Sequence, residues 1–193
     1  MENASAKTTQ SATVTRGGGE CAVFSGKGFY EVECLAPDGS LKWKDTISNL
    51  MPTAGLNDVL DKYWKGSAYT AAHYVGLLQI AGSPVVAAGD TMSSHAGWTE
   101  FTVISESPNV RQTLTLGSVS AASVDNSASK ATFTIGAISP QSQNIDGCFI
   151  TTNATLGGTT GTLVSAGLFT GGSKSVSLGD TLNVTFTNSM TSA

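Results

Sequence analysis

Few residues of this chain have the types and spacing that catalysis or metal binding requires. The two histidines, His73 and His95, stand outside any HxH, HxxxH or HExxH pattern. Such patterns bring two imidazoles to one metal ion, so the sequence offers no zinc site. We therefore expect each histidine to be a packed or hydrogen-bonding residue. No GxSxG segment is present, so no residue is marked as the nucleophile of a hydrolase.

Carboxylates offer a second route to catalysis, since a pair of them can hydrolyse a glycosidic bond. The acids beyond residue 66 are sparse, and most of them stand in turn sequences such as Gly-Asp-Thr; they are Asp90, Glu100, Glu106, Asp125, Asp146 and Asp180. We expect turn roles for them. A glycan hydrolase would instead require acids such as Asp90, Glu100 and Asp146 to converge in a groove. No DxDxDG loop for calcium is present.

The remaining candidates also favour structural roles. The glycine-rich stretches match no phosphate-binding pattern, and Trp43, Trp64 and Trp98 are spread along the chain, as core or interface anchors would be. Cys21 and Cys34, with Cys148, form no CxxC pair; we expect buried thiols and leave a Cys21–Cys34 disulfide open. The sequence predicts no catalytic, cofactor-binding or metal-binding residue, and so a protein that is not an enzyme.

Composition and charge argue against two classes of partner, nucleic acids and membranes. The 193 residues carry a net charge of −4, and only 12% of them are charged, about half the usual share. No cluster of Lys and Arg is present, so we expect no nucleic-acid partner. No apolar run approaches the ~18 residues of a membrane span, and the N-terminus does not resemble a signal peptide. We therefore expect neither a membrane partner nor secretion.

The chain divides into an arm and one domain. Residues 1–27 are polar, lack periodicity and contain Gly17-Gly18-Gly19, which predicts an extended N-terminal arm. Either this arm is a disordered terminus, or it becomes ordered on a neighbouring subunit. Residues 28–193 are expected to form a single domain, since chains of ~100–200 residues commonly do.

The start of this domain predicts a hairpin and one helix. Residues 28–50 predict the hairpin: apolar and acidic residues alternate before the turn Ala36-Pro37-Asp38-Gly39, and the return strand runs from Leu41 to Ile47. Residues 53–65 predict a helix with Thr53 as its N-cap and Gly66 just beyond its end. Apolar residues recur at helical spacing (Leu56, Val59, Leu60, Tyr63), which predicts a face packed against a sheet.

Short strands predominate beyond residue 67. Large apolar residues alternate with threonine most clearly in 131–136 and 181–188, as in an antiparallel sheet with one wet face. The predicted strands are Ala72–Ile80, Thr99–Ile104, Arg111–Ser118, Ala131–Gly136, Gly147–Thr152, Thr162–Leu168 and Thr181–Asn188. The expected fold class is mainly β: an antiparallel β-sandwich, jelly-roll-like, with one short helix and an extended N-terminal arm.

Several segments resemble a family of small virion proteins of tailed bacteriophages and prophages. In residues 27–79 they are KWKDTISNL, GLNDVLDKY and YVGL, and later AAGDTMSSHAGWTE, ASKATFTI and SLGDTLNVTFT. The resemblance covers roughly residues 27–188, leaves the arm aside and carries over no catalytic residue. It implies a capsid decoration (cement) protein, made in the host bacterial cytoplasm and placed on the capsid exterior. Its implied partners are the major capsid protein and further copies of itself, commonly as a homotrimer.

The sequence is compatible with three classes of function. A decoration protein would be present in hundreds of copies per particle and would stabilise it. A tail-associated or receptor-binding β-protein would be present in few copies and would bind host polysaccharide or protein. An enzyme is the least supported, because no group of ionisable residues suggests a reaction. The sequence favours decoration and does not specify oligomeric state, strand order or the partner surface.

Overall fold

A computed structural model describes residues 24–69, 72–80, 85–106, 108–137 and 142–192, with the arm predicted over residues 1–27 lying outside it up to residue 23. The chain forms twelve strands, one α-helix and a π-helical turn within these residues. Their bounds are β1 Phe24–Leu35, β2 Leu41–Ser48, α1 Thr53–Val59, η1 Leu60–Trp64, β3 Tyr74–Ile80, β4 Trp98–Phe101, β5 Gln112–Thr113, β6 Ser123–Asp125, β7 Ala131–Thr134, β8 Ser142–Ile145, β9 Gly147–Thr151, β10 Leu163–Leu168, β11 Lys174–Ser177 and β12 Thr181–Ser192.

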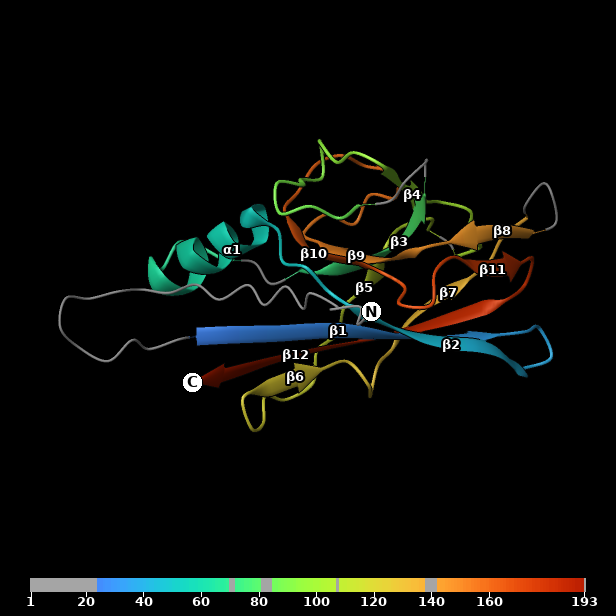
Figure 1. The fold of residues 1–193 in the computed structure, drawn as a ribbon, viewed down its shortest axis with the longest axis horizontal. Helices are drawn as coiled ribbons and strands as arrows, with labels where there is room; N and C mark the ends of the chain where they lie inside the picture. The colour runs from blue at the N-terminus through green and yellow to red at the C-terminus, as the bar shows by residue number, and fades with distance from the viewer. Residues whose placement is uncertain (1–23, 70–71, 81–84, 107, 138–141, 193) are drawn as a thin grey trace, which may run out of the picture.

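The strands form two main antiparallel sheets that face each other (Figure 1). The first has the order β2-β1-β12-β6, and β7 also pairs with β12; the second has the order β10-β9-β3-β4, with β5 on β3. Strands β8 and β11 form a separate two-stranded ribbon. Strands β1 and β12 pair over their whole lengths, from Phe24 opposite Ser192 to Leu35 opposite Thr181. The expected antiparallel, mainly β fold is confirmed.

The core lies between the two sheets. Tyr30 and Val32 are fully buried, while Glu31 between them is partly exposed, because successive side chains of a strand point to opposite faces. Val75 and Ile150 come from the second sheet into the same cluster. A smaller cluster, which includes Leu78, Trp98 and Phe149, covers the other face of the second sheet, so β9 is buried on both faces.

Backbone bridges join the two sheets at both edges. Leu50, just after β2, exchanges two hydrogen bonds with Ala166 of β10, of 2.7 and 2.9 Å. On the other side Ile104 is bridged to Ile135, just after β7. Paired backbone groups at these edges leave fewer free donors and acceptors and hold the two layers in a fixed relation.

The predicted hairpin is confirmed, with its turn at residues 36–39 and Gly39 at a φ of 83°. The predicted arm boundary is wrong at its end, because β1 begins at Phe24, and so the described domain starts before residue 28. The strand predicted at Arg111–Ser118 is reduced to Gln112–Thr113. Three short strands, β6, β8 and β11, were not predicted. Each has only three or four residues, too few for alternation to be visible.

The helix differs from its prediction in three respects. Pro52 occupies the N-cap position with no side-chain cap, and Thr53 is already helical. The last turn is π-helical from Leu60 to Trp64, after which Gly66, with a φ of 75°, ends the helix as expected. The apolar face does not pack on a sheet: Leu60 is 56% exposed and Tyr63 is 79% exposed. The helix instead contacts β10 through Gly55, where an added Cβ would lie 2.5 Å from the carbonyl oxygen of Val164.

A buried ion pair holds one end of the second sheet. Arg111, with 1% of its surface exposed, donates from Nε and Nη2 to the two carboxylate oxygens of Glu100, both at 2.8 Å. It also donates to the carbonyl oxygens of Asn153 and Gly158, and its guanidinium lies 5.2 Å from the ring centre of Phe149. Buried charge is tolerated only when it is paired and hydrogen-bonded in this way.

Arg111→Ala is expected to lower the free energy of unfolding by about 3–5 kcal/mol, because it leaves the Glu100 carboxylate buried without its partner. Lys130→Ala is the matched control: it breaks the surface ion pair with Glu33 and should cost less than about 1 kcal/mol. Urea denaturation followed by circular dichroism measures both. Equal decreases in the free energy of unfolding of the two variants would show that the buried pair contributes no more to stability than the surface pair.

Candidate interaction surface

The carboxylates considered for catalysis make structural hydrogen bonds. Asp90 accepts from the backbone N–H of Ala87 at 3.0 Å and from Trp98 Nε1 at 3.1 Å. Asp146 accepts from the N–H of Ile80 at 2.7 Å and from the hydroxyl of Ser173. These contacts agree with the expected turn and loop roles, and Glu100 is the partner of Arg111.

The other acids make similar contacts. Asp125 accepts from the N–H of Ser127 at 2.8 Å, and Asp180 accepts from the N–H of Ser177 at 2.7 Å and pairs with Lys42. Glu106 accepts from the N–H of Thr134, which extends the contact between β7 and the segment after β4. Each of these carboxylates fixes a loop or strand end.

The two histidines lie apart, each beside an aromatic ring. The ring of His95 stacks on that of Trp98 with 3.6 Å between centroids, whereas His73 lies 3.4 Å from the hydroxyl of Tyr69. Trp98 is buried, and only Trp64 among the three tryptophans is largely exposed, at 73%. Across the described ranges no group of three or more His, Cys, Asp and Glu side chains is placed to hold a metal ion.

Two of the cysteines are buried thiols. Burial raises the pKa of Cys34 to about 12, and the nearby Asp180 carboxylate adds to the shift. Burial also raises the pKa of Cys148 well above its usual range. Both thiols are therefore protonated and unreactive at neutral pH. Cys21, the other half of the disulfide left open above, lies outside the described residues.

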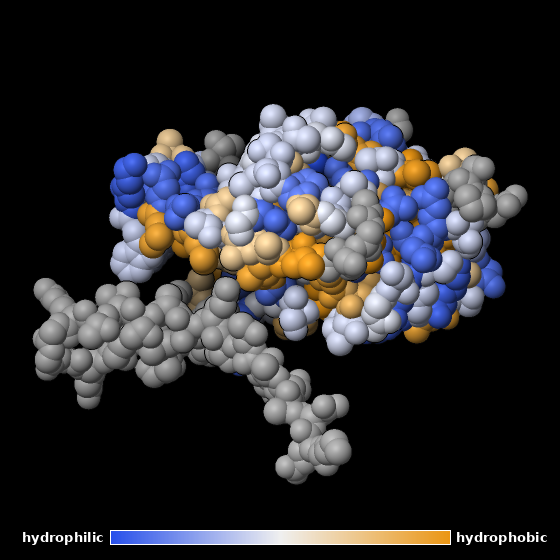
Figure 2. All heavy atoms as spheres, turned by 45° about the horizontal axis from the view of Figure 1, so that its top comes forward, coloured by the Kyte–Doolittle hydropathy of each residue, from blue (hydrophilic) through white to orange (hydrophobic). Residues whose placement is uncertain are grey.

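The most unusual feature is an apolar helix face that points to solvent. Five side chains, which we call the helix surface, are 37–79% exposed; they are Leu56, Val59, Leu60, Tyr63 and Trp64. The rings of Tyr63 and Trp64 pack edge to face, 5.5 Å apart. A helix this short is marginal in water without packing, and a contiguous exposed apolar patch commonly marks an interaction site. Figure 2 shows exposed hydrophobic side chains at this end of the molecule.

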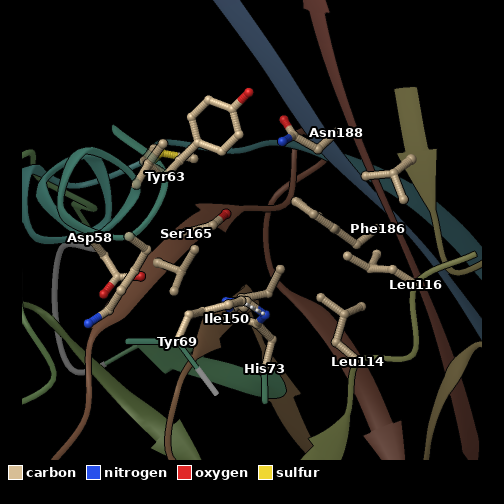
Figure 3. Close-up of a pocket in the computed structure, with 15 residues that line it drawn as sticks. Asp58, Tyr63, Tyr69, His73, Leu114, Leu116, Ile150, Ser165, Phe186 and Asn188 are labelled. Atoms are coloured by element: carbon tan, nitrogen blue, oxygen red, sulfur yellow. Dashed lines mark hydrogen bonds between the residues drawn. The ribbon is translucent and has the colours of Figure 1, made fainter. Parts of the chain in front are cut away.

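A groove of about 330 Å³ lies beneath the helix. Figure 3 shows Tyr63 on the helix side and Phe186 and Asn188 of β12 opposite, with Ile150 between them. Most of the lining is apolar and comes from β9, β10, β12 and the segment after β5; it includes Leu114, Leu116, Ile150, Val164 and Phe186. The groove therefore opens where the inner face of the first sheet extends beyond the second sheet.

Polar groups at the groove are few and mostly neutral. Ser165 lies 2.6 Å from the hydroxyl of Tyr30 and accepts from Asn49 Nδ2 at 2.7 Å. Burial raises the pKa of Tyr30 well above its usual range, so its hydroxyl stays protonated. Burial lowers the pKa of His73, and the nearby Asp58 carboxylate offsets part of that shift. Asp58 takes part in none of the ion pairs seen in the described residues.

Sequence reasoning identified the helix but not its orientation. Periodicity groups apolar residues on one face and cannot say whether that face meets this chain's own sheet or another molecule. Gly55 was the available signal, because a glycine within a helix marks close contact with a neighbour, here β10. The groove had no signal, since its lining residues are far apart in the sequence.

Comparisons with known proteins found no counterpart: no family model, no curated protein and no solved structure matches the chain. No helix in the part of the chain that the structure describes is long and apolar enough to cross a membrane.

His73 at the groove should make stability depend on pH. Burial lowers its pKa in the folded state, so the unfolded chain binds a proton more readily. Its contribution to stability is present above the unfolded pKa of ~6.5 and declines as the pH falls below that value. His73→Gln should therefore flatten the loss of unfolding free energy between pH 7 and pH 5, measured by urea denaturation. His95→Gln retains His73 and should keep this component; an unchanged slope in His73→Gln would contradict the assignment.

Proposed function

We propose that this protein is a structural component of a tailed-bacteriophage particle, a decoration (cement) protein that binds the outer surface of the major capsid shell and stabilises it. The observation that carries the proposal is the helix surface, whose apolar side chains face solvent. Such a surface is suited to binding another protein. The choice of a capsid as that protein rests on the resemblance of residues 27–188 to phage virion proteins.

The helix surface suits insertion into a groove of a partner. An amphipathic helix commonly binds this way, with anchors at positions i, i+4 and i+7, here Leu56, Leu60 and Tyr63. Tyr63 and Trp64 are the most exposed of the five side chains, and large aromatic residues often supply most of the binding energy at interfaces. The bridged sandwich behind the helix provides a stiff body, which suits a protein that must resist strain in a shell.

Charge supports an exterior position. The chain has a net charge of −4 with 10 Lys and Arg residues. Two of its lysines near the helix, Lys62 and Lys65, are paired with Asp61. A protein of this composition has little attraction for packaged DNA, which favours the outside of a shell over its lumen.

Copy number is the first test. Quantitative mass spectrometry of purified particles, against the major capsid protein, should give a ratio between one to one and one to a few. On heating, particles that lack the protein should lose their DNA at a lower temperature than particles that carry it. A handful of copies would instead place the protein in the tail, and its absence from particles would refute a virion role.

The helix surface is tested by substitution. Tyr63→Ser with Trp64→Ser should weaken binding to particles that lack the protein at least about 30-fold, since hot-spot side chains contribute ~2 kcal/mol or more. Leu178→Ser is the control, because Leu178 is 58% exposed in the turn between β11 and β12 and away from the helix. Sedimentation of particles with labelled protein measures both, and circular dichroism checks folding. Equal binding by both variants would show that the helix surface does not contact the particle.

A further inference from the structure

The groove lies beside the point where the chain enters the domain. Strand β1 begins at Phe24, opposite Ser192, and Gly28 lies opposite Asn188, which lines the groove. Four strand residues correspond to ~13 Å. Figure 1 shows the start of β1, the end of β12 and α1 at the same end of the molecule. Residues 1–23 are therefore tethered within a short distance of an apolar groove that no described residue fills.

We propose that residues 12–16 of this same chain bind in the groove. In an extended conformation Ala12, Val14 and Arg16 lie on one face of the segment. A groove of about 330 Å³ is at the small end of the range for ligand sites and suits a few small side chains such as Ala12 and Val14.

Charge complementarity fixes the placement of the segment. Of the two oppositely charged residues Asp58 and Lys62 that line the groove, Lys62 is paired with Asp61, whereas Asp58 forms no ion pair with the described residues. Lys7 and Arg16 are the basic residues of the first 23. Arg16 follows Val14 by two residues, so an extended segment with Val14 in the groove presents Arg16 on the same side, toward the rim that carries Asp58. A guanidinium is well suited to pair with a carboxylate.

The connection is long enough and can reverse direction. From Arg16 to Phe24 the chain can span about 26 Å at ~3.3 Å per residue, twice the ~13 Å between Phe24 and the groove wall. Gly17-Gly18-Gly19 lies within this connection, and glycine can adopt turn conformations without steric cost. A short tether gives an effective concentration in the millimolar range, so the chain's own segment prevails over that of a second copy at micromolar protein.

Disulfide trapping tests the proposal. Val14→Cys is combined with Leu116→Cys in the groove, in a Cys21→Ser background, while Cys34 and Cys148 remain as buried thiols. The matched control pairs Val14→Cys with Leu178→Cys, which is exposed but lies in the turn before β12. Under mild oxidation at micromolar protein, the groove pair should form an intramolecular disulfide at least tenfold faster than the control, measured by intact mass and non-reducing gels.

Charge reversal separates specific binding from chance encounters. Arg16→Glu in the groove pair should slow trapping several-fold, and adding Asp58→Arg should restore it. Equal trapping in the groove and control pairs, or indifference to both charge changes, would overturn the proposal. Disulfide-linked dimers without the intramolecular product would overturn it in favour of a second copy as the occupant. None of these readouts requires a phage particle, so the result is independent of the proposed function.

Discussion

The antiparallel pairing of β1 with β12 is the contact on which the rest of the first sheet depends. It joins twelve residues near the start of the chain to twelve at its end. Strands β2, β6 and β7 pair within this sheet only with β1 or β12, so none of them has a place in it without the central pair. Because this pairing joins residues far apart in sequence, the sheet can close only after the whole chain is available. Its inner face also supplies much of the core, including Tyr30, Val32 and Val184.

The groove is a consequence of the length of this pair. Along one face of β12, Phe186 is 7% exposed in the core, Asn188 lines the groove and Met190 is 40% exposed. Burial therefore declines along the strand as the pair runs beyond the second sheet. The helix spans part of the gap: Asp58, Val59, Lys62 and Tyr63 line the groove, while Leu56, Leu60 and Trp64 face solvent away from it. The long central pair thus accounts for both the groove and the entry point of the chain beside it.

The sequence was informative wherever a local pattern determines the structure. Alternation located most of the longer strands, and Pro37-Asp38-Gly39 located the first hairpin turn. It was uninformative where the outcome depends on distant partners. The burial of Arg111 depends on Glu100 and on two carbonyl groups some 40 residues away. The direction of the helix face depends on Gly55 fitting against Val164, a contact that periodicity does not encode. Short strands such as β8 form only because a partner strand is already in place.

The way the helix is held has a consequence for binding. Its start is fixed by Gly55 against β10 and by a 2.8 Å hydrogen bond from the N–H of Thr53 to the carbonyl oxygen of Ala88. Its end is closed by Asp61, which accepts from Ser67 and pairs with Lys65. The helix is thus ordered by its two ends, and the helix surface is left free between them. A partner that covers it would not have to order the helix first, so less of the binding free energy would be lost to conformational entropy. An exposed apolar face costs solubility in the free protein, and such a cost is consistent with a surface that is covered in the protein's working state.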